Sequence, residues 1–323
     1  MKTKLIIIFF LCLLNLNAQD KLRVGVLAYG TVNWELDVLK HNNFDKKNNF
    51  QLEVVKLASK NASAVAFQSG AVDIIVTDWV WVNRQRASNK DFTFYPYSKA
   101  MGTMLVDPAN DINTLLDLKG KYVGVSGGPL DKTWLLFRAY SKYKYNKDLK
   151  DIIHPVFASA PILYEKLSNN SLDAGINFWH FNAKLEAKGL KPLITFDEIS
   201  KQLGITNDIS FVGWTFNRDF ALKNKELINS FLNASLSSKK LLNDSNKEWD
   251  RIRPLMKVKD DITFEALKNG YKKGIIKKFD ENNIQAQAKI FQILLEEGGK
   301  KLVGKSVSLE KETFWDFKPN MKW

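Results

Sequence analysis

A glycine pair inside a short polar loop is the part of this sequence best suited to ligand binding. Gly127 and Gly128 lie in the phrase Ser-Gly-Gly-Pro-Leu-Asp, which ends at Asp131. Glycines let a backbone approach a ligand without a Cβ clash, and Pro129 suits the first position of a helix. The free N–H groups and the dipole of that helix would favour a carboxylate, a sulfonate or a similar anion. The alternative is that the glycines only make a tight turn.

Aromatic side chains are the second feature with binding potential. Four tryptophans could stack on a flat or cationic ligand, namely Trp79, Trp81, Trp179 and Trp214. Trp79 and Trp179 each stand six residues after an aspartate, in two related phrases one hundred residues apart. We therefore expect these two rings to face one space between two lobes. Ordinary packing in the core is the alternative for each ring.

Asp78 and His180 are candidates for hydrogen bonds that orient a ligand. Asp78 follows a run of buried residues, where an ionised carboxylate is costly unless it is paired. A ligand amine, a donor from the second lobe or the backbone of the following helix would each satisfy it. An anion on the Gly127-Gly128 loop and an amine near Asp78 together predict a zwitterion. Asp78, Asp131 and His180 could instead supply oxygen and nitrogen ligands to a metal, although their spacing is not diagnostic of a metal site.

The remaining motifs argue against catalysis and nucleic-acid binding. The chain has three histidines, no Gly-x-Ser-x-Gly elbow, no His-Glu-x-x-His motif and no Gly-Lys-Ser/Thr after the glycine loop. Its one cysteine, Cys12, excludes structural disulfides and cysteine-rich metal sites. The net charge is +13, but the lysines are dispersed rather than gathered into a block. We expect no enzyme, no cofactor and no nucleic-acid partner.

Alternating strand-like and helix-like segments would position these residues. Strands are predicted at residues 22–28, 52–57, 72–77, 122–125, 152–157 and 172–177. Helices are predicted between them at residues 33–41, 61–69, 130–144, 160–167 and 179–188, and then at 226–242, 264–271 and 284–297. This order predicts an α/β fold with two lobes of similar construction, each on a mainly parallel sheet.

The ends of the predicted strands define the candidate site. Ligands of open α/β sheets bind beyond the carboxyl ends of the strands. The ligand-binding candidates are Tyr29, Thr31, Asn33, Asp78, Trp79, Trp81, Gly127, Gly128, Asp131, Asn177, Trp179, His180 and Trp214. We place the first lobe at residues 19–105 and 214–323 and the second at residues 106–213. Two crossover segments between lobes would form a hinge around a cleft.

The first residues have the pattern of a secretory signal peptide. Lys2 and Lys4 precede an apolar run over residues 5–14, and Ala18 offers a small residue for cleavage. Ten apolar residues are too few to span a bilayer. We therefore expect residues 1–18 to be a cleavable signal peptide and the mature protein to be periplasmic.

Two phrases carry a resemblance to a known family. One is Asp-Leu-Lys-Gly-Lys-Tyr-Val-Gly-Val at residues 117–125, and the other is Gln-Ser-Gly-Ala-Val-Asp at residues 68–73. They resemble stretches of the periplasmic substrate-binding proteins of ABC transporters. The type is that of nitrate, sulfonate and taurine, which also includes binders of thiamine pyrimidine precursors. The resemblance implies a type II periplasmic binding protein fold, with the ligand held between lobes and delivered to a permease in the inner membrane.

The ligand and the assembly follow as expectations. We expect a monomer that closes on a small organic anion or zwitterion such as a sulfonate. A receptor for a metal chelate or for an aromatic amine, such as a thiamine precursor, is the alternative. Some relatives make a pyrimidine with a cysteine-rich motif, which this chain lacks.

Overall fold

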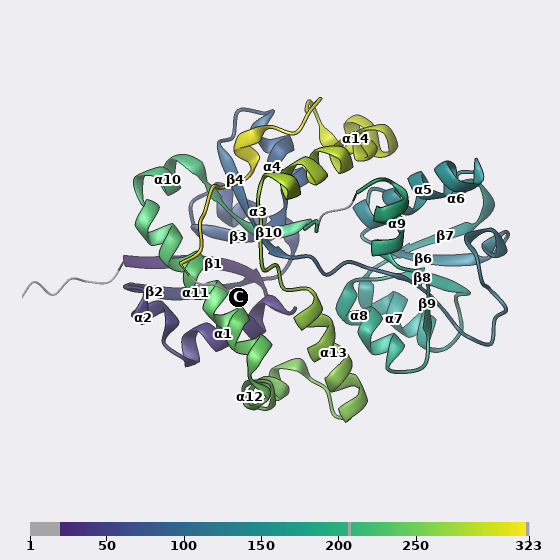
Figure 1. Cartoon of the computed structure of the whole chain (residues 1–323), viewed down its shortest axis with the longest axis horizontal. Helices are drawn as coiled ribbons and strands as arrows, with labels where there is room; N and C mark the ends of the chain where they lie inside the picture. Colours follow the sequence, from purple (N-terminus) through teal and green to yellow (C-terminus); the bar gives the residue numbers. More distant parts are fainter. Residues whose placement is uncertain (1–19, 206–207, 321–322) are drawn as a thin grey trace, which may run out of the picture.

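The computed structural model describes residues 20–205, 208–320 and 323, and the chain forms two lobes around two five-stranded sheets (Figure 1). The expected signal peptide, residues 1–18, lies outside the described residues. No helix within the described part of the chain is long and apolar enough to cross a membrane.

The first sheet has the strand order β2-β1-β3-β10-β4. Its strands are β1 (Asp20–Leu27), β2 (Phe50–Leu57), β3 (Ile74–Asp78), β4 (Phe92–Ser98) and β10 (Val212–Asn217). β1 is parallel to β2 and β3, whereas β10 is antiparallel to β3 and β4. The early helices of this lobe are α1 (Val32–His41), α2 (Phe44–Lys47), α3 (Lys60–Gln68) and α4 (Trp79–Arg86).

The second sheet repeats this plan with the order β7-β6-β8-β5-β9. Its strands are β5 (Met104–Val106), β6 (Tyr122–Ser126), β7 (His154–Ala158), β8 (Ala174–Ile176) and β9 (Lys191–Ile194). β6 is parallel to β7 and β8, and β5 is antiparallel to β8 and β9. Its helices are η1 (Leu115–Leu118), α5 (Lys132–Tyr145), α6 (Leu149–Ile152), α7 (Ala160–Ser168), α8 (Trp179–Glu186) and α9 (Phe196–Gln202).

The repeated sequence phrase has the same structural role in both lobes. The carboxylate of Asp73 accepts a hydrogen bond from the backbone N–H of Arg23 in β1, and that of Asp173 accepts one from Tyr122 in β6, both at 2.8 Å. Each aspartate directly precedes a strand and thus ties that strand to its parallel neighbour. Gly70 and Asn170 precede them with φ of 74° and 57°, the left-handed conformation that glycine and asparagine tolerate.

Two crossover segments connect the sheets. The chain leaves β4 and passes through residues 99–103 to β5, which is the first crossover, and it returns between α9 and β10, which is the second. We expected the second lobe to begin at Val106, but Met104 and Leu105 already pair with β8 and β9. Likewise Val212 and Gly213 pair with the first sheet. We therefore propose lobe boundaries that follow sheet membership.

The C-terminal region is helical, as predicted. It contains α10 (Arg218–Lys223), α11 (Lys225–Asp244), α12 (Asn246–Met256), α13 (Asp261–Lys273), α14 (Glu281–Val303) and η2 (Lys311–Thr313). α14 spans the two lobes, because it packs on α4 of the first and α5 of the second (Figure 1). Its Asn283 and Gln287 side chains donate hydrogen bonds to the carbonyls of Asp208 and Ser210 in the second crossover, at 2.9 and 3.1 Å.

A buried ionic network fixes the helices of the first lobe. The Glu35 side chain is 0% exposed and accepts hydrogen bonds from Ser235 Oγ at 2.5 Å and Tyr271 Oη at 2.9 Å, and it pairs with Lys239. Burial lowers the pKa of Lys239, and the Glu35 charge opposes this effect. The network joins α1, α11 and α13, so it sets the packing of three helices that are distant in sequence.

Removing one charge of this network should destabilise the lobe strongly. Lys239→Met leaves the Glu35 carboxylate buried without its counter-ion, so we expect a loss of about 3–5 kcal/mol in the free energy of unfolding. Urea denaturation measures it. Lys223→Met is the control, because Lys223 pairs with Asp219 on an exposed helix face, and its loss should cost about 0.5 kcal/mol or less. Similar losses for the two variants would contradict this account.

Candidate functional site

An ion pair joins the two lobes where their parallel strands end. Asp78 is the last residue of β3 in the first lobe, and Lys132 is the first residue of α5 in the second. Asp78 Oδ2 lies 2.9 Å from Lys132 Nζ, and the two side chains are 18% and 23% exposed. Asp78 Oδ1 also accepts a hydrogen bond from the backbone N–H of Trp81 at 2.9 Å, which caps α4. Two of the partners expected for Asp78, a helix cap and a second-lobe donor, are thus both present.

The local charges keep this pair ionised. Burial alone would raise the pKa of Asp78, but the charge and hydrogen bond of Lys132 outweigh it and lower that pKa. Burial would lower the pKa of Lys132, and Asp78 outweighs it in the same way, so that pKa is raised. At neutral pH both groups carry their charge. The interface therefore holds a carboxylate from one lobe and an ammonium from the other.

The predicted glycine loop depends on glycine at both positions. Gly127 and Gly128 have φ of 84° and 85°, and a Cβ on Gly127 would lie 2.6 Å from Asp131 Oδ2. We expected Pro129 to begin the helix, but α5 begins at Lys132 because Asp131 is its N-cap and accepts a hydrogen bond from Trp134 N–H at 3.1 Å. Burial raises the pKa of Asp131. Ligand contact by the loop stays a prediction.

Aromatic contacts also cross between the lobes. Trp179 at the start of α8 is partly buried and packs edge-on against Trp34 of α1, with ring centroids 6.4 Å apart. The ammonium of Lys60, at the start of α3, lies 5.6 Å from the ring centroid of Phe178. Sequence reasoning missed Lys60, Phe178 and Lys132. The available signal was their position at or next to the start of a helix that follows a predicted strand.

Two of the predicted tryptophans are core residues. Trp79 is 0% exposed and stacks on Phe211 with ring centroids 5.8 Å apart, so the expectation that it faces the cleft is wrong. The first residue of a helix can direct its side chain under the helix, and here α4 lies over the sheet. Trp214 is buried in the first-lobe core, where its indole N–H donates to Ser235 Oγ at 3.1 Å. Trp81 is partly buried and stacks on Phe92.

Of the other predicted ligand residues, some are buried or stabilise loops and one is exposed to solvent. Asn177 is buried and donates a hydrogen bond to the Ala160 carbonyl at 2.9 Å, which makes it structural. Asn33 Nδ2 donates to the carbonyls of Leu27 and Gly30 and so shapes the loop after β1. Thr31, at the start of α1, is buried. Tyr29, in the same loop, is 66% exposed.

His180 occupies an aromatic environment beside Trp179. Its ring centroid lies 4.6 Å from that of Phe181 and 5.7 Å from that of Trp179. Burial lowers the pKa of His180 to about 4, and the Lys184 charge acts in the same direction. His180 is therefore neutral at physiological pH and can hydrogen-bond but not bind an anion as a cation.

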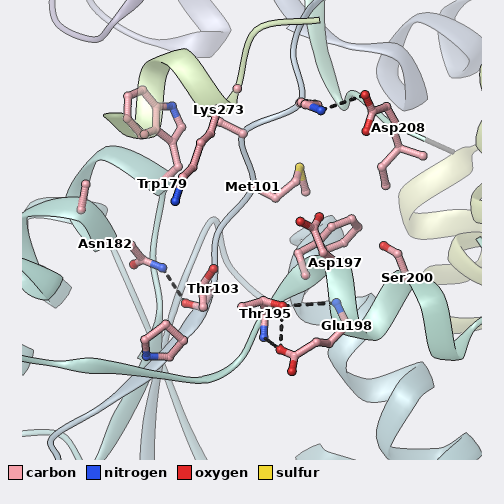
Figure 2. Close-up of a pocket in the computed structure, with 18 of the residues that line it drawn as sticks. Met101, Thr103, Trp179, Asn182, Thr195, Asp197, Glu198, Ser200, Asp208 and Lys273 are labelled. Carbon is pink, nitrogen blue, oxygen red and sulfur yellow. Dashed lines mark hydrogen bonds and ion pairs between the residues drawn. The ribbon is translucent and has the colours of Figure 1, made fainter. Parts of the chain in front are cut away.

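A pocket lies beside the two crossovers. It has a volume of about 970 Å³ and is lined by both crossovers together with residues of α8, α9 and α13. Figure 2 shows Asn182, whose side chain donates to the Thr103 carbonyl at 2.6 Å, and Trp179 above it. Another side of the pocket is lined by an ion pair, in which Lys99 Nζ lies 2.8 Å from Asp208 Oδ2. Trp179 is the one predicted ligand residue that lines this pocket, so it belongs both to the pocket and to the strand-end site.

The metal alternative gains no support from the described residues. In that part of the chain, no group of three or more histidine, cysteine, aspartate or glutamate side chains is placed to hold a metal ion. Asp78 is already engaged by Lys132 and Trp81, and Asp131 by Trp134.

Two lobes with this strand order, joined by two crossovers, define the type II periplasmic binding protein fold. The chain belongs to the NMT1/THI5-like family, whose model matches residues 38–245. Comparison with curated proteins gives no match. The family and the fold confirm the resemblance to substrate-binding proteins of ABC transporters that the sequence phrases indicated.

Solved structures share the fold at low sequence identity. The periplasmic aliphatic sulphonate binding protein SsuA from Escherichia coli is 17% identical, with 94% of each chain covered and a TM-score of 0.72. The alkanesulfonate-binding protein SsuA from Xanthomonas axonopodis pv. citri, bound to MOPS, is 16% identical, with 91% of this chain and 98% of that chain covered and a TM-score of 0.69. The desulfurization enzyme DSZB is 13% identical, with 88% and 95% covered and a TM-score of 0.57. Because binding proteins and an enzyme share this fold, function must be argued from the site.

The low pKa of His180 predicts a pH-dependent stability. A histidine has a pKa of about 6.5 when unfolded and His180 has one of about 4 in the fold, so the unfolded chain binds the proton first. The stability is complete above about pH 6.5 and is lost as the pH falls toward 4. Between pH 8 and pH 5 we expect wild type to lose about 1–2 kcal/mol more than His180→Gln in urea denaturation.

The matched control for this measurement is His154→Gln, because His154 is an exposed residue of β7. That variant should keep the pH dependence of the wild type. If His180→Gln loses as much stability as the wild type over the same range, His180 is not the group responsible.

Proposed function

We propose that this protein is an extracytoplasmic solute-binding protein, not an enzyme, that captures a small organic anion or zwitterion between its lobes. The observation that carries the proposal is the contact of both lobes at their strand ends, where Asp78 meets Lys132. A ligand that touches both lobes favours the closed arrangement over the open one. We further propose that the protein is a monomer in the periplasm and that it delivers the ligand to an ABC permease.

The charges at the strand ends support an anionic ligand group. Lys132 and Lys60 bring two positive charges to the interface, and the backbone of the Gly127-Gly128 loop precedes α5. An unpaired Asp78 carboxylate would repel an anion. Its pairing with Lys132 removes that objection without a ligand amine. The sulfonates bound by the two SsuA proteins are anions of this kind.

The aromatic residues support an organic part of the ligand. Trp179 is partly buried where it contacts Trp34 of the first lobe, and Phe178 is partly open to solvent. Such rings pack on apolar or flat groups, which a bare inorganic ion lacks. An organic sulfonate therefore fits both properties. We use ethanesulfonate, taurine and MOPS as probes, because they share the sulfonate and differ in the amine and in bulk.

The glycine loop provides the direct test. Gly128→Asp adds a negative charge beside the proposed anion site, so we expect at least about a tenfold loss of affinity for the sulfonate that wild type binds best in isothermal titration calorimetry. Gly120→Asp is the matched control in the same lobe. Both glycines have positive φ, 85° and 72°, and a Cβ added at either would meet no atom within 4 Å, but Gly120 precedes β6 at the far end of the sheet.

The control should bind as wild type does. Equal affinities for Gly128→Asp and wild type would show that the loop does not contact the anion. Tighter binding of neutral or purely cationic compounds than of any sulfonate would instead favour the aromatic-amine alternative.

A further inference from the structure

Among the described residues, the Lys132 ammonium has a single hydrogen-bond partner, which comes from the opposite lobe, and the nearby charge of Asp131 also favours its protonated form. Asp78 provides this hydrogen bond, at 2.9 Å. Lysine carries three donors on a flexible four-carbon stem, so two donors are available for another acceptor. The pair is 18% and 23% exposed, which leaves it within reach of a solute entering between the lobes.

Asp78 is fixed in place, whereas Lys132 can move. One Asp78 oxygen is held by the backbone N–H of Trp81 at 2.9 Å, so the carboxylate belongs to the rigid junction of β3 and α4. Within the described part of the chain, the Lys132 side chain donates no hydrogen bond other than the one to Asp78. When an anion approaches, the ammonium is therefore the group that changes partner. Asp78 keeps its helix cap and remains near the charge of Lys60.

We propose that Lys132 binds the anionic group of the ligand and that Asp78 is its resting partner, which holds the lobes together while the cleft is empty. The first part of this inference, that Lys132 binds the ligand anion, rests on the proposed function. The second part, that Asp78 and Lys132 hold the empty lobes together in a resting contact, concerns the protein without ligand and does not depend on it. Ligand binding then exchanges one ion pair of Lys132 for another, and Asp78 retains the Trp81 hydrogen bond and the nearby charge of Lys60.

This exchange predicts opposite effects for the two partners. Asp78→Asn keeps an oxygen for the Trp81 cap and removes the charge that competes with the ligand, so affinity for ethanesulfonate should rise about tenfold. Lys132→Met removes the anion partner, so affinity should fall by about tenfold or more. Lys132→Arg should retain most of the affinity, because it keeps the charge.

Both Asp78→Asn and Lys132→Met should open the ligand-free protein. Small-angle scattering without ligand should give a larger radius of gyration for each variant than for wild type. Lys121→Met is the matched control, since Lys121 pairs with Asp173 within the second lobe at 3.5 Å, away from the cleft. It should match wild type in both scattering and calorimetry. Circular dichroism and a urea unfolding curve establish that each variant is folded.

The outcomes separate this inference from the proposed function. If Asp78→Asn weakens taurine and leaves ethanesulfonate unchanged, Asp78 is an amine site and the exchange is wrong, while solute binding stands. If Lys132→Met binds ethanesulfonate as wild type does, the assignment of Lys132 is overturned. If wild type binds none of the sulfonates, the proposed ligand class and the first part of the inference both fail. The resting contact is then supported if Asp78→Asn and Lys132→Met have a larger radius of gyration than wild type, and it is overturned if they do not.

Discussion

The two crossovers set the geometry on which the rest of the structure depends. Each joins the sheets at the end where the parallel strands stop, since Val212 lies opposite Asp78 and Ser98, and Met104 lies opposite Ile176. The carboxyl ends of both sheets are therefore brought to one interface. Helices begin there in both lobes, and their caps and first-turn side chains meet across it. The contact of Asp78 with Lys132 follows from this arrangement.

The Glu35–Lys239 and Asp78–Lys132 ion pairs serve different purposes because their surroundings differ. The Glu35–Lys239 pair is 0% and 4% exposed and has hydroxyl donors around it, so it can only be broken at a high cost. The Asp78–Lys132 pair is partly open to solvent, where water screens the attraction and breaking the pair costs less. It can therefore exchange a partner, which a fully buried pair cannot.

Local sequence patterns predicted the fold but only part of the site. The repeated phrase identified two similar lobes because Asp73 and Asp173 make the same strand-tying hydrogen bond. Asp131 and the glycine loop were recognisable because capping and positive φ are local properties. Lys132 was missed because its partner is distant in sequence and belongs to the other lobe. Strands β4, β5, β9 and β10 were not predicted, since their pairing depends on the crossovers.

The matched tryptophans show why similar lobes need not offer similar ligand contacts. Trp79 and Trp179 both begin a helix after the third parallel strand of their lobe, yet Trp79 packs against Phe211, Phe291 and Phe314. Phe291 belongs to α14 and Phe314 follows η2, and the second lobe has no counterpart of these segments in the described chain.

Trp179 instead meets Trp34 of the first lobe, with Gly270 of α13 leaving room for its ring, since a Cβ there would lie 2.9 Å from it. The C-terminal helices thus cover the tryptophan of one lobe and leave that of the other at the interface. The first lobe then contributes a fixed carboxylate, and the second contributes the movable ammonium and the aromatic ring. A ligand with an anionic end and an apolar body would consequently find most of its partners on the second lobe, and closure would bring the first lobe against it.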